Sequence, residues 1–123
     1  MKHDKKKTLV LGASPDTTRY ANMCVRRLAS MDIPVVPFGI NKGEIEGIEI
    51  LNSPNGEMDI HTITLYLGPQ NQPQYYDYIF SLNPKRIIFN PGTENLELEE
   101  MANEKGIETV TACTLTMLAI GGF

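Results

Sequence analysis

Three short segments of this 123-residue chain combine small, polar and basic residues in patterns that could bind a phosphate group. The first is Gly12-Ala13-Ser14, which ends a short apolar run just before a helical pattern. A strand that turns directly into a helix points backbone N–H groups and the positive end of the helix dipole at one spot. Gly12 permits a tight turn, Ala13 adds little bulk, and the Ser14 hydroxyl can donate to an anion.

The same segment also has a purely structural interpretation, as a turn followed by a helix cap provided by Ser14, Asp16 or Thr17. It also departs from the dinucleotide fingerprint G-x-G-x-x-G, because Ser14 and Thr17 stand where the second and third glycines would be. The loop alone therefore predicts a phosphate contact without naming the ligand.

The second segment, Gly39-Ile40-Asn41-Lys42-Gly43, follows the next expected strand. NAD-binding units carry an Asp or Glu here to bind the ribose hydroxyls, but the first acid after this expected strand is Glu44. Lys42 would suit a phosphate on the ribose or elsewhere in a nucleotide. This argues against NAD(H) and leaves NADP or another phosphorylated adenosine, unless Lys42 is simply an exposed loop lysine.

The third segment is Asn90-Pro91-Gly92, which follows a buried-strand pattern and leads to Thr93, either a crevice residue or a helix cap. Gly68-Pro69 gives a similar low-bulk strand end. Cys113 comes just after the last expected strand, where it could face the same crevice or be an ordinary buried thiol.

Residues that could perform catalysis are few. His3 lies in the basic start of the chain, and His61 begins a strand, far from its carboxyl end. The sequence has no Cys/His metal spacing, no HExxH and no GxSxG motif, and the glutamates of residues 97–104 fit a solvated helix face. We expect no catalytic machinery and no metal site.

The elements that position these segments alternate between strand and helix patterns. Apolar strand runs are expected at residues 9–11, 33–38, 60–67, 86–89 and 107–111, with a short candidate at 48–51 and a turn-rich stretch at 39–47 between them. Amphipathic helices are expected around residues 21–28, 75–80 and 98–105, with a helical turn or two at 115–120. Short connections predict a doubly wound, mostly parallel α/β sheet of the Rossmann kind with helices on both faces. Ligands bind such sheets at the carboxyl ends of the strands.

Composition sets further limits. The chain has 41% hydrophobic and 21% charged residues, and its net charge of −4 argues against extended nucleic-acid binding. The apolar run behind MKHDKKK is too short for a signal peptide or membrane span. We therefore expect a basic tail at residues 1–7, one domain at 8–123, free cysteines and a cytoplasmic protein. The apolar end, residues 115–123, would pack on its own sheet or on a second copy in a homodimer.

Three stretches together resemble the small single-domain CoA-binding proteins, which are similar to the CoA-binding domain of the succinyl-CoA synthetase alpha subunit. They are GASPDTTRYA, VVPFGINKGE and FNPGTENLELEEMANEKGIETV, followed by a late Cys113. The resemblance covers about Lys7 to Leu118. It departs at Gly39-Ile40-Asn41, where relatives commonly have Val-Asn-Pro, and it does not extend to the ligase's phosphorylated histidine, so acyl-CoA synthesis is not implied.

The resemblance implies roles for particular residues. Gly12, Ala13, Ser14 and Pro15 would line the phosphate site, and Arg19 stands near a position that is often basic in relatives. Lys42 would meet the nucleotide end of CoA, which carries the 3′-phosphate. The full set expected to bind the ligand is Gly12, Ala13, Ser14, Pro15, Arg19, Gly39, Asn41, Lys42, Gly68, Pro69, Asn90, Pro91 and Gly92.

The function favoured by these patterns is a CoA-binding, or related nucleotide-binding, module without catalysis of its own. Two alternatives stay open. One is an enzyme, either NADP-dependent or acting on CoA thiols and disulfides through Cys113. The other is a regulatory protein whose nucleotide crevice is vestigial.

Overall fold

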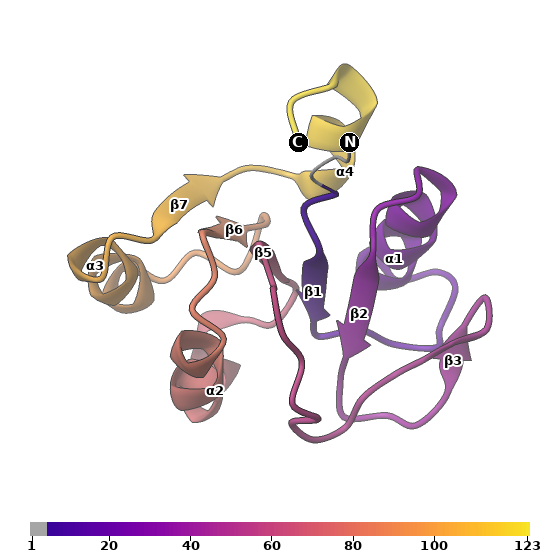
Figure 1. The fold of residues 1–123 in the computed structure, drawn as a ribbon, viewed down its shortest axis with the longest axis horizontal. Coiled ribbons are helices and arrows are strands. Elements are labelled where there is room, and N and C mark those ends of the chain that lie inside the picture. Colours follow the sequence, from indigo (N-terminus) through magenta and orange to yellow (C-terminus); the bar gives the residue numbers. More distant parts are fainter. Residues whose placement is uncertain (1–4) are drawn as a thin grey trace.

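The structure is a computed structural model that describes residues 5–123, so His3 lies outside the described residues. Five strands, β1 (Thr8–Leu11), β2 (Val35–Phe38), β5 (Thr62–Leu65), β6 (Arg86–Phe89) and β7 (Glu108–Thr111), form one sheet. Four α-helices surround it, α1 (Tyr20–Ser30), α2 (Tyr76–Ser81), α3 (Leu96–Glu104) and α4 (Thr114–Ile120) (Figure 1). This is the doubly wound α/β fold predicted from the sequence.

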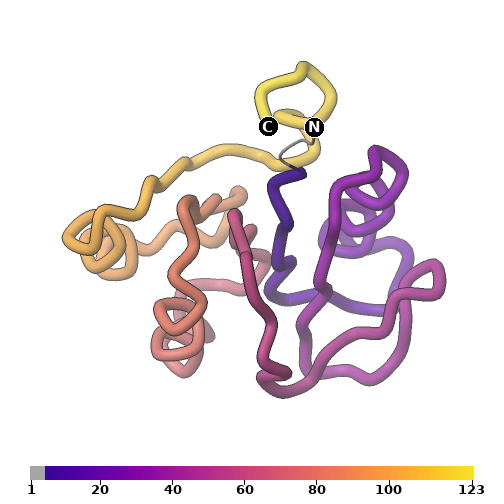
Figure 2. The backbone as a smooth tube through the Cα atoms, viewed as in Figure 1, coloured from indigo at the N-terminus to yellow at the C-terminus, as the bar shows by residue number. Residues whose placement is uncertain are grey.

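The sheet is wholly parallel, in the order β2-β1-β5-β6-β7. The chain builds outward from β1 to β2 and then crosses back, so that β5 pairs with the other edge of β1. Figure 2 shows this division, with the chain up to about residue 50 on one side of β1 and most of the remainder on the other. The strand order therefore reverses between β1 and β5, which is the place where such sheets bind ligands.

The two faces of the sheet have separate cores because strand side chains alternate between them. Leu9, Leu11, Ile63 and their neighbours pack with Ile79 of α2 and with Leu98 and Ala102 of α3. On the other face Val10 packs with Cys24, Val25 and Leu28 of α1 and with Leu118 of α4. Helices thus cover both faces, as expected.

The segment after β2 contains a hairpin that the sequence did not predict. β3 (Glu44–Ile45) pairs antiparallel with β4 (Ile48–Glu49), although residues 39–47 are expected to be only turns. Glu46 and Gly47 both have positive φ, 49° and 83°, which is the conformation of a tight two-residue hairpin turn. The expected strand at 48–51 is therefore shorter, and Leu51 forms an isolated bridge with Phe38.

The connection from β5 to α2 is also more irregular than the pattern suggested. Two short 3₁₀ turns, Pro69–Asn71 and Pro73–Tyr75, precede α2, each with a proline in its first turn. Proline fits there because its missing N–H would be unpaired anyway. Among residues 5–123, no helix is long and apolar enough to cross a membrane.

Candidate functional site

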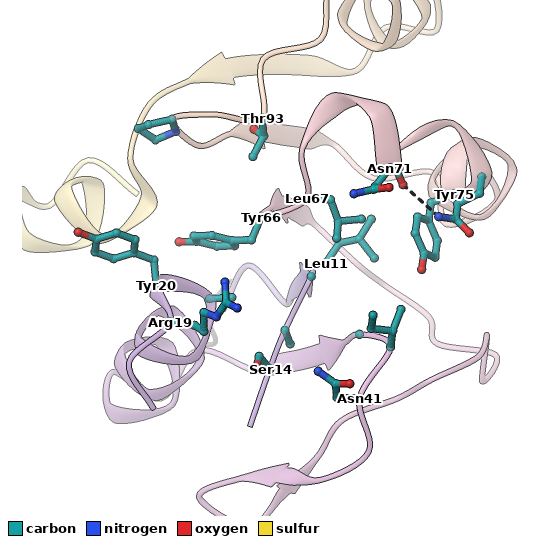
Figure 3. A pocket seen from close by; sticks show the side chains of 17 residues that line it. Leu11, Ser14, Arg19, Tyr20, Asn41, Tyr66, Leu67, Asn71, Tyr75 and Thr93 are labelled. Atoms are coloured by element: carbon teal, nitrogen blue, oxygen red, sulfur yellow. Dashed lines mark hydrogen bonds between the residues drawn. The ribbon is translucent and has the colours of Figure 1, made fainter. Parts of the chain in front are cut away.

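A pocket of about 480 Å³ lies at the carboxyl ends of β1, β2, β5 and β6. That volume is typical of small-molecule sites. Figure 3 shows Tyr66 and Leu67 near its centre, with Ser14, Arg19 and Tyr20 toward one side, Asn71 and Tyr75 toward the other, and Thr93 across from them. The pocket therefore sits at the reversal point of the strand order.

Two glycines let the loops after β1, β2 and β5 approach one another closely. Gly12 has φ 104°, and a Cβ there would stand 3.0 Å from the backbone carbon of Tyr66. Gly39 is buried, and a Cβ would overlap the carbonyl oxygen of Ala13. The N–H groups of Gly12 and Ala13 both donate to the Phe38 carbonyl, at 2.8 and 2.9 Å. The small size of these residues therefore lets the loops that border the pocket contact one another. It also leaves space for a ligand.

The N-terminus of α1 opens on this pocket without a cap. Its N-cap residue is Arg19, which makes no side-chain capping bond, and no hydrogen bond within residues 5–123 uses the backbone N–H of Tyr20, Ala21 or Asn22. Tyr20 and Ala21 line the pocket. The first turn of α1 therefore offers free donors and the positive end of the helix dipole to an anion.

The alternative interpretation, in which Ser14, Asp16 or Thr17 caps the helix, is wrong for α1. Ser14 Oγ instead accepts from the Asp16 N–H at 3.1 Å. The Asp16 carboxylate accepts from the N–H and hydroxyl of Thr18, at 2.9 and 2.7 Å, which lowers the pKa of Asp16. These hydrogen bonds are confined to the loop before α1, so they leave the first N–H groups of the helix free.

Side-chain carboxamides hold the loops around the pocket. Asn22 donates to the Ser14 carbonyl at 2.9 Å. Asn52 donates to the carbonyls of Gly39 and Asn41, at 2.7 and 3.1 Å. Each amide satisfies backbone groups that a loop cannot pair by itself, and so fixes one wall of the pocket.

Gln72 does the same for two loops at once. It is fully buried, and its amide donates to Leu67 O at 2.9 Å and Thr93 O at 2.8 Å, which joins the ends of β5 and β6. Its oxygen accepts from Asn95, whose own oxygen caps α3 by accepting the Leu98 N–H. Thr93 is therefore not the helix cap considered from the sequence, and its hydroxyl donates to Asn90 O at 2.8 Å.

Asn90 is buried, and its side-chain amide and oxygen form hydrogen bonds with other parts of the protein. Its amide donates to Thr64 Oγ1 and Leu65 O, both at 2.7 Å, and its oxygen accepts from the Thr114 N–H at 2.8 Å. All of these partners lie within the fold, so Asn90 joins β5, β6 and α4 and does not line the pocket.

About half of the residues expected at the site line the pocket: Gly12, Ala13, Ser14, Arg19, Gly39, Asn41 and Pro91. The others do not: Pro15, Lys42, Gly68, Pro69, Asn90 and Gly92. Lys42 is exposed next to Asn41, Gly68 and Pro69 begin a 3₁₀ turn, and the Gly92 N–H donates to Glu94.

Several lining residues were missed by the sequence argument. They lie within expected elements or next to the expected segments: Leu11, Tyr20, Ala21, Ile40, Tyr66, Leu67, Asn71, Gln74 and Tyr75. The prolines of residues 69–73 were the available signal, because they mark an irregular segment directly after a central strand.

Two cysteines lie near Tyr66, which lines the pocket. Cys24 is fully buried, and burial raises the pKa of its thiol to about 11. The Tyr66 hydroxyl is buried beside Cys24 and Thr114 without a hydrogen bond of standard geometry, and burial raises its pKa. Cys113, the half-buried N-cap residue of α4, does not line the pocket. The hydroxyl and N–H of Thr116 lower the pKa of Cys113.

The remaining candidates for chemistry lie apart from the pocket. His61 precedes β5, at the opposite end of the sheet, and bonds the Thr62 hydroxyl at 2.7 Å. Glu97 accepts from the Tyr76 hydroxyl on the surface. Within residues 5–123, no three His, Cys, Asp or Glu side chains are grouped so that they could hold a metal ion.

Fold and pocket together define a Rossmann-like domain with a ligand crevice at the switch point of its sheet. The CoA binding domain family model matches residues 6–119. The chain therefore belongs to the CoA-binding domain family, which confirms the resemblance seen in the sequence.

Solved structures share the fold over most of the chain. One protein of uncharacterised function is 52% identical, with a TM-score of 0.95 over 98% of this chain and all of its own. A Thermus thermophilus protein is 24% identical, with a TM-score of 0.83 over 96% of this chain and 90% of its own. An acetyl-coenzyme A synthetase from Ca. Korarchaeum cryptofilum, solved with phosphate and ADP, is 19% identical, with a TM-score of 0.71 over 87% of this chain and 25% of its own. No curated protein matches the chain.

Proposed function

We propose that this protein binds coenzyme A in the pocket at the carboxyl end of its sheet, with the diphosphate at the N-terminus of α1. The observation that carries this proposal is the set of free N–H groups at Tyr20, Ala21 and Asn22 beside Arg19. Helix N-termini of this kind bind phosphate through backbone donors and the helix dipole. Membership of the CoA-binding domain family supports the identity of the ligand.

The two ends of CoA would then lie on opposite sides of the diphosphate. The adenosine end lies toward Ile40, Asn41 and Tyr75, whose apolar and amide groups border one side of the pocket. Lys42, which is exposed next to Asn41, would meet the 3′-phosphate at the edge of the pocket. The pantetheine arm lies toward Tyr66 and Thr93.

The loop after β2 supports CoA over NAD. No carboxylate lines the pocket, and Glu44, the first acid after β2, belongs to the β3–β4 hairpin. An NAD site would need that acid near the end of β2 to bind the ribose hydroxyls. NADP carries a ribose phosphate that Lys42 could also meet, so NADP is the more informative competitor.

Calorimetric titration with CoA, dephospho-CoA, NAD and NADP tests this proposal. We expect CoA to bind most tightly and dephospho-CoA more weakly, because it lacks the phosphate assigned to Lys42. Equal affinity for CoA and the dinucleotides would contradict the proposal. Thermal shift with the same ligands also distinguishes a CoA-binding protein from one with a vestigial crevice, which would show no rise in melting temperature. In a CoA-binding protein, CoA at 100-fold over Kd should raise the free energy of unfolding by about 2.7 kcal/mol.

A pair of arginine variants tests the placement. Arg19 lines the pocket, whereas Arg27 lies on the exposed side of α1, near its end. We expect Arg19→Ala to weaken CoA binding about tenfold, as loss of one charged hydrogen bond does. Arg27→Ala makes the same change in net charge and should leave the affinity unchanged. Equal losses in both would show that the effect is only overall charge.

One observation keeps a thiol enzyme as the second candidate. The lowered pKa of Cys113 favours its thiolate, which is the nucleophilic form. It would attack a CoA disulfide, forming a protein–CoA mixed disulfide and releasing the other thiolate. Cys113→Ser should abolish this exchange while Cys24→Ser retains it, and equal rates in wild type and Cys113→Ser would eliminate the candidate.

A further inference from the structure

A second cavity, of about 630 Å³, lies at the amino end of the sheet, opposite the pocket proposed for CoA. It is bordered by residues that immediately precede β1, β5 and β6. Its charged and titratable residues are Lys5, Lys6, Lys7, Asp59, His61 and Lys85. Four of the chain's eleven lysines and arginines thus border one cavity in a protein whose net charge is −4.

Only some of these ammonium groups have protein partners. Lys7 forms an ion pair with Glu57 at 3.1 Å and donates to Met58 O. Lys6 donates to Phe123 O at 2.7 Å. Neither Lys5 nor Lys85 forms an ion pair within residues 5–123. Like charges that border one cavity repel one another, and a bound anion would relieve that repulsion.

The cavity is built on backbone that is firmly held. The Lys7 carbonyl accepts from the N–H groups of His61 and Thr62, and the His61 carbonyl accepts from those of Lys85 and Arg86. These bonds join the amino ends of three neighbouring strands. Lys7 and Lys85 therefore stand on backbone that the sheet holds in place.

The backbone around the cavity is also unusual. The described chain has five non-glycine residues with positive φ, and three of them, Lys6 (41°), Asp59 (63°) and Asn83 (47°), border this cavity. Such conformations persist where the surrounding structure enforces them, and they gather at ligand sites. Asn83 is the residue after the C-cap of α2, where a left-handed residue commonly ends a helix, whereas Lys6 and Asp59 lie in the segments that lead into β1 and β5.

We propose that this cavity is a second anion site, which binds a small ligand carrying two or more phosphate charges. Phosphate is favoured over carboxylate because lysines bind phosphate as point charges, and a phosphate group carries up to about two charges at neutral pH, whereas a carboxylate carries one. The site is separate from the pocket at α1 and does not depend on what that pocket binds.

Titration of inorganic pyrophosphate into ¹⁵N-labelled protein, with CoA already at saturation, tests this proposal. CoA occupies the first pocket, so pyrophosphate should shift the amides of Ile60, His61 and Lys85 and leave those of residues 12–22 unchanged. If CoA does not bind, the same titration into the free protein should still shift the amides around Lys85, which separates failure of the two proposals.

Two matched variants decide whether the lysines form the site. Lys85→Ala should weaken pyrophosphate binding about tenfold, the effect of losing one charged hydrogen bond. Lys105→Ala removes the same charge from an exposed lysine beside the Phe80 ring and should have no effect. Equal losses in the two variants, shifts confined to residues 12–22, or equally tight binding of citrate would each overturn the proposal.

Discussion

The two ends of the parallel sheet carry opposite kinds of anion chemistry. At the carboxyl end, the pocket has one charged lining residue, Arg19, and otherwise offers backbone N–H groups, amides and tyrosines. At the amino end, four lysines border the cavity. The end proposed to bind CoA is therefore the one with fewer charged side chains.

The difference shows how backbone geometry can provide a positive potential for an anion without charged side chains. At the carboxyl end, α1 contributes its dipole and free donors, both fixed by the strand–turn–helix connection. Parallel strands present no helix N-terminus at their amino ends in the same way, so recognition there must come from side chains. The carboxyl end is thus organised by backbone geometry, and the amino end by lysines.

The largest effect that we expect comes from filling the space between the β1 and β2 loops. Gly39→Ala places a methyl group against the Ala13 carbonyl, so the two loops must separate. We expect the free energy of unfolding to fall by about 3 kcal/mol, as in overpacked cores, and CoA binding to be lost. Urea denaturation and calorimetry measure the two effects.

Gly122→Ala is the matched control for that substitution. A Cβ at Gly122 would meet only ordinary contacts, the closest at 3.8 Å, and its φ is not in the left-handed range. Its unfolding free energy should stay within about 0.5 kcal/mol of wild type. If Gly39→Ala is equally mild, close contact between the loops does not organise the carboxyl end.

The sequence predicted the fold well because local patterns determine it. The strand at residues 86–89 was expected with the bounds that the structure shows, and the apolar stripe of Ala21, Cys24, Val25 and Leu28 does face the core. The β3–β4 hairpin was missed because its strands are only two residues long, and so short a segment shows no periodicity.

The site was less predictable because its organisation depends on contacts between distant segments. Gln72 joins Leu67 to Thr93, and nothing in its local sequence distinguishes it from the exposed Gln74. Asn90 was expected to face the ligand, but the fold surrounds it with partners. Lys85 and Lys7 are 78 positions apart in the numbering, and only the register of the sheet brings them to one cavity.

The second effect concerns the carboxamides that hold the carboxyl end. Gln72→Leu keeps the side-chain volume but leaves the carbonyls of Leu67 and Thr93 unpaired. We expect a loss of about 2 to 3 kcal/mol of unfolding free energy from these buried groups, together with weaker CoA binding. Gln74→Leu is the control for stability alone, since this exposed side chain makes one 3.4 Å bond and itself lines the pocket. Equal stability of the two variants would show that Gln72 does not hold the loops.

A smaller loss of unfolding free energy, about 2 kcal/mol, should appear at alkaline pH. It arises because burial at the carboxyl end keeps a thiol and a phenol in their neutral forms. Burial raises the pKa of Cys24 to about 11 and also raises that of Tyr66. A raised pKa means that the folded state holds its proton longer, so this stability is complete below the ordinary thiol pKa. It is lost as pH rises from about 9 toward about 11.

Urea denaturation at pH 8 and pH 10.5 measures this loss. Cys24→Ala should lose less stability than wild type between the two values, because the buried thiol is gone. Cys113→Ala should retain the full loss, since the pKa of Cys113 is lowered. A parallel decline in wild type and Cys24→Ala would mean that the alkaline loss does not arise from the Cys24 thiol.

The smallest expected effect is the coupling between the two ends. Each strand between them has four residues, so the cavities are separated by about 13 Å of strand at roughly 3.3 Å per residue. That distance exceeds the Debye length of about 8 Å at physiological salt, so charge at one end is largely screened from the other. Saturating pyrophosphate should therefore change the Kd for CoA by less than about twofold.

The Arg19→Ala and Lys85→Ala effects should likewise add in the double variant to within about 0.5 kcal/mol. A tenfold change in CoA affinity would instead mean that β1 and β5 transmit the charge state of the lysines to the helix terminus, and the two ends would then form one linked site.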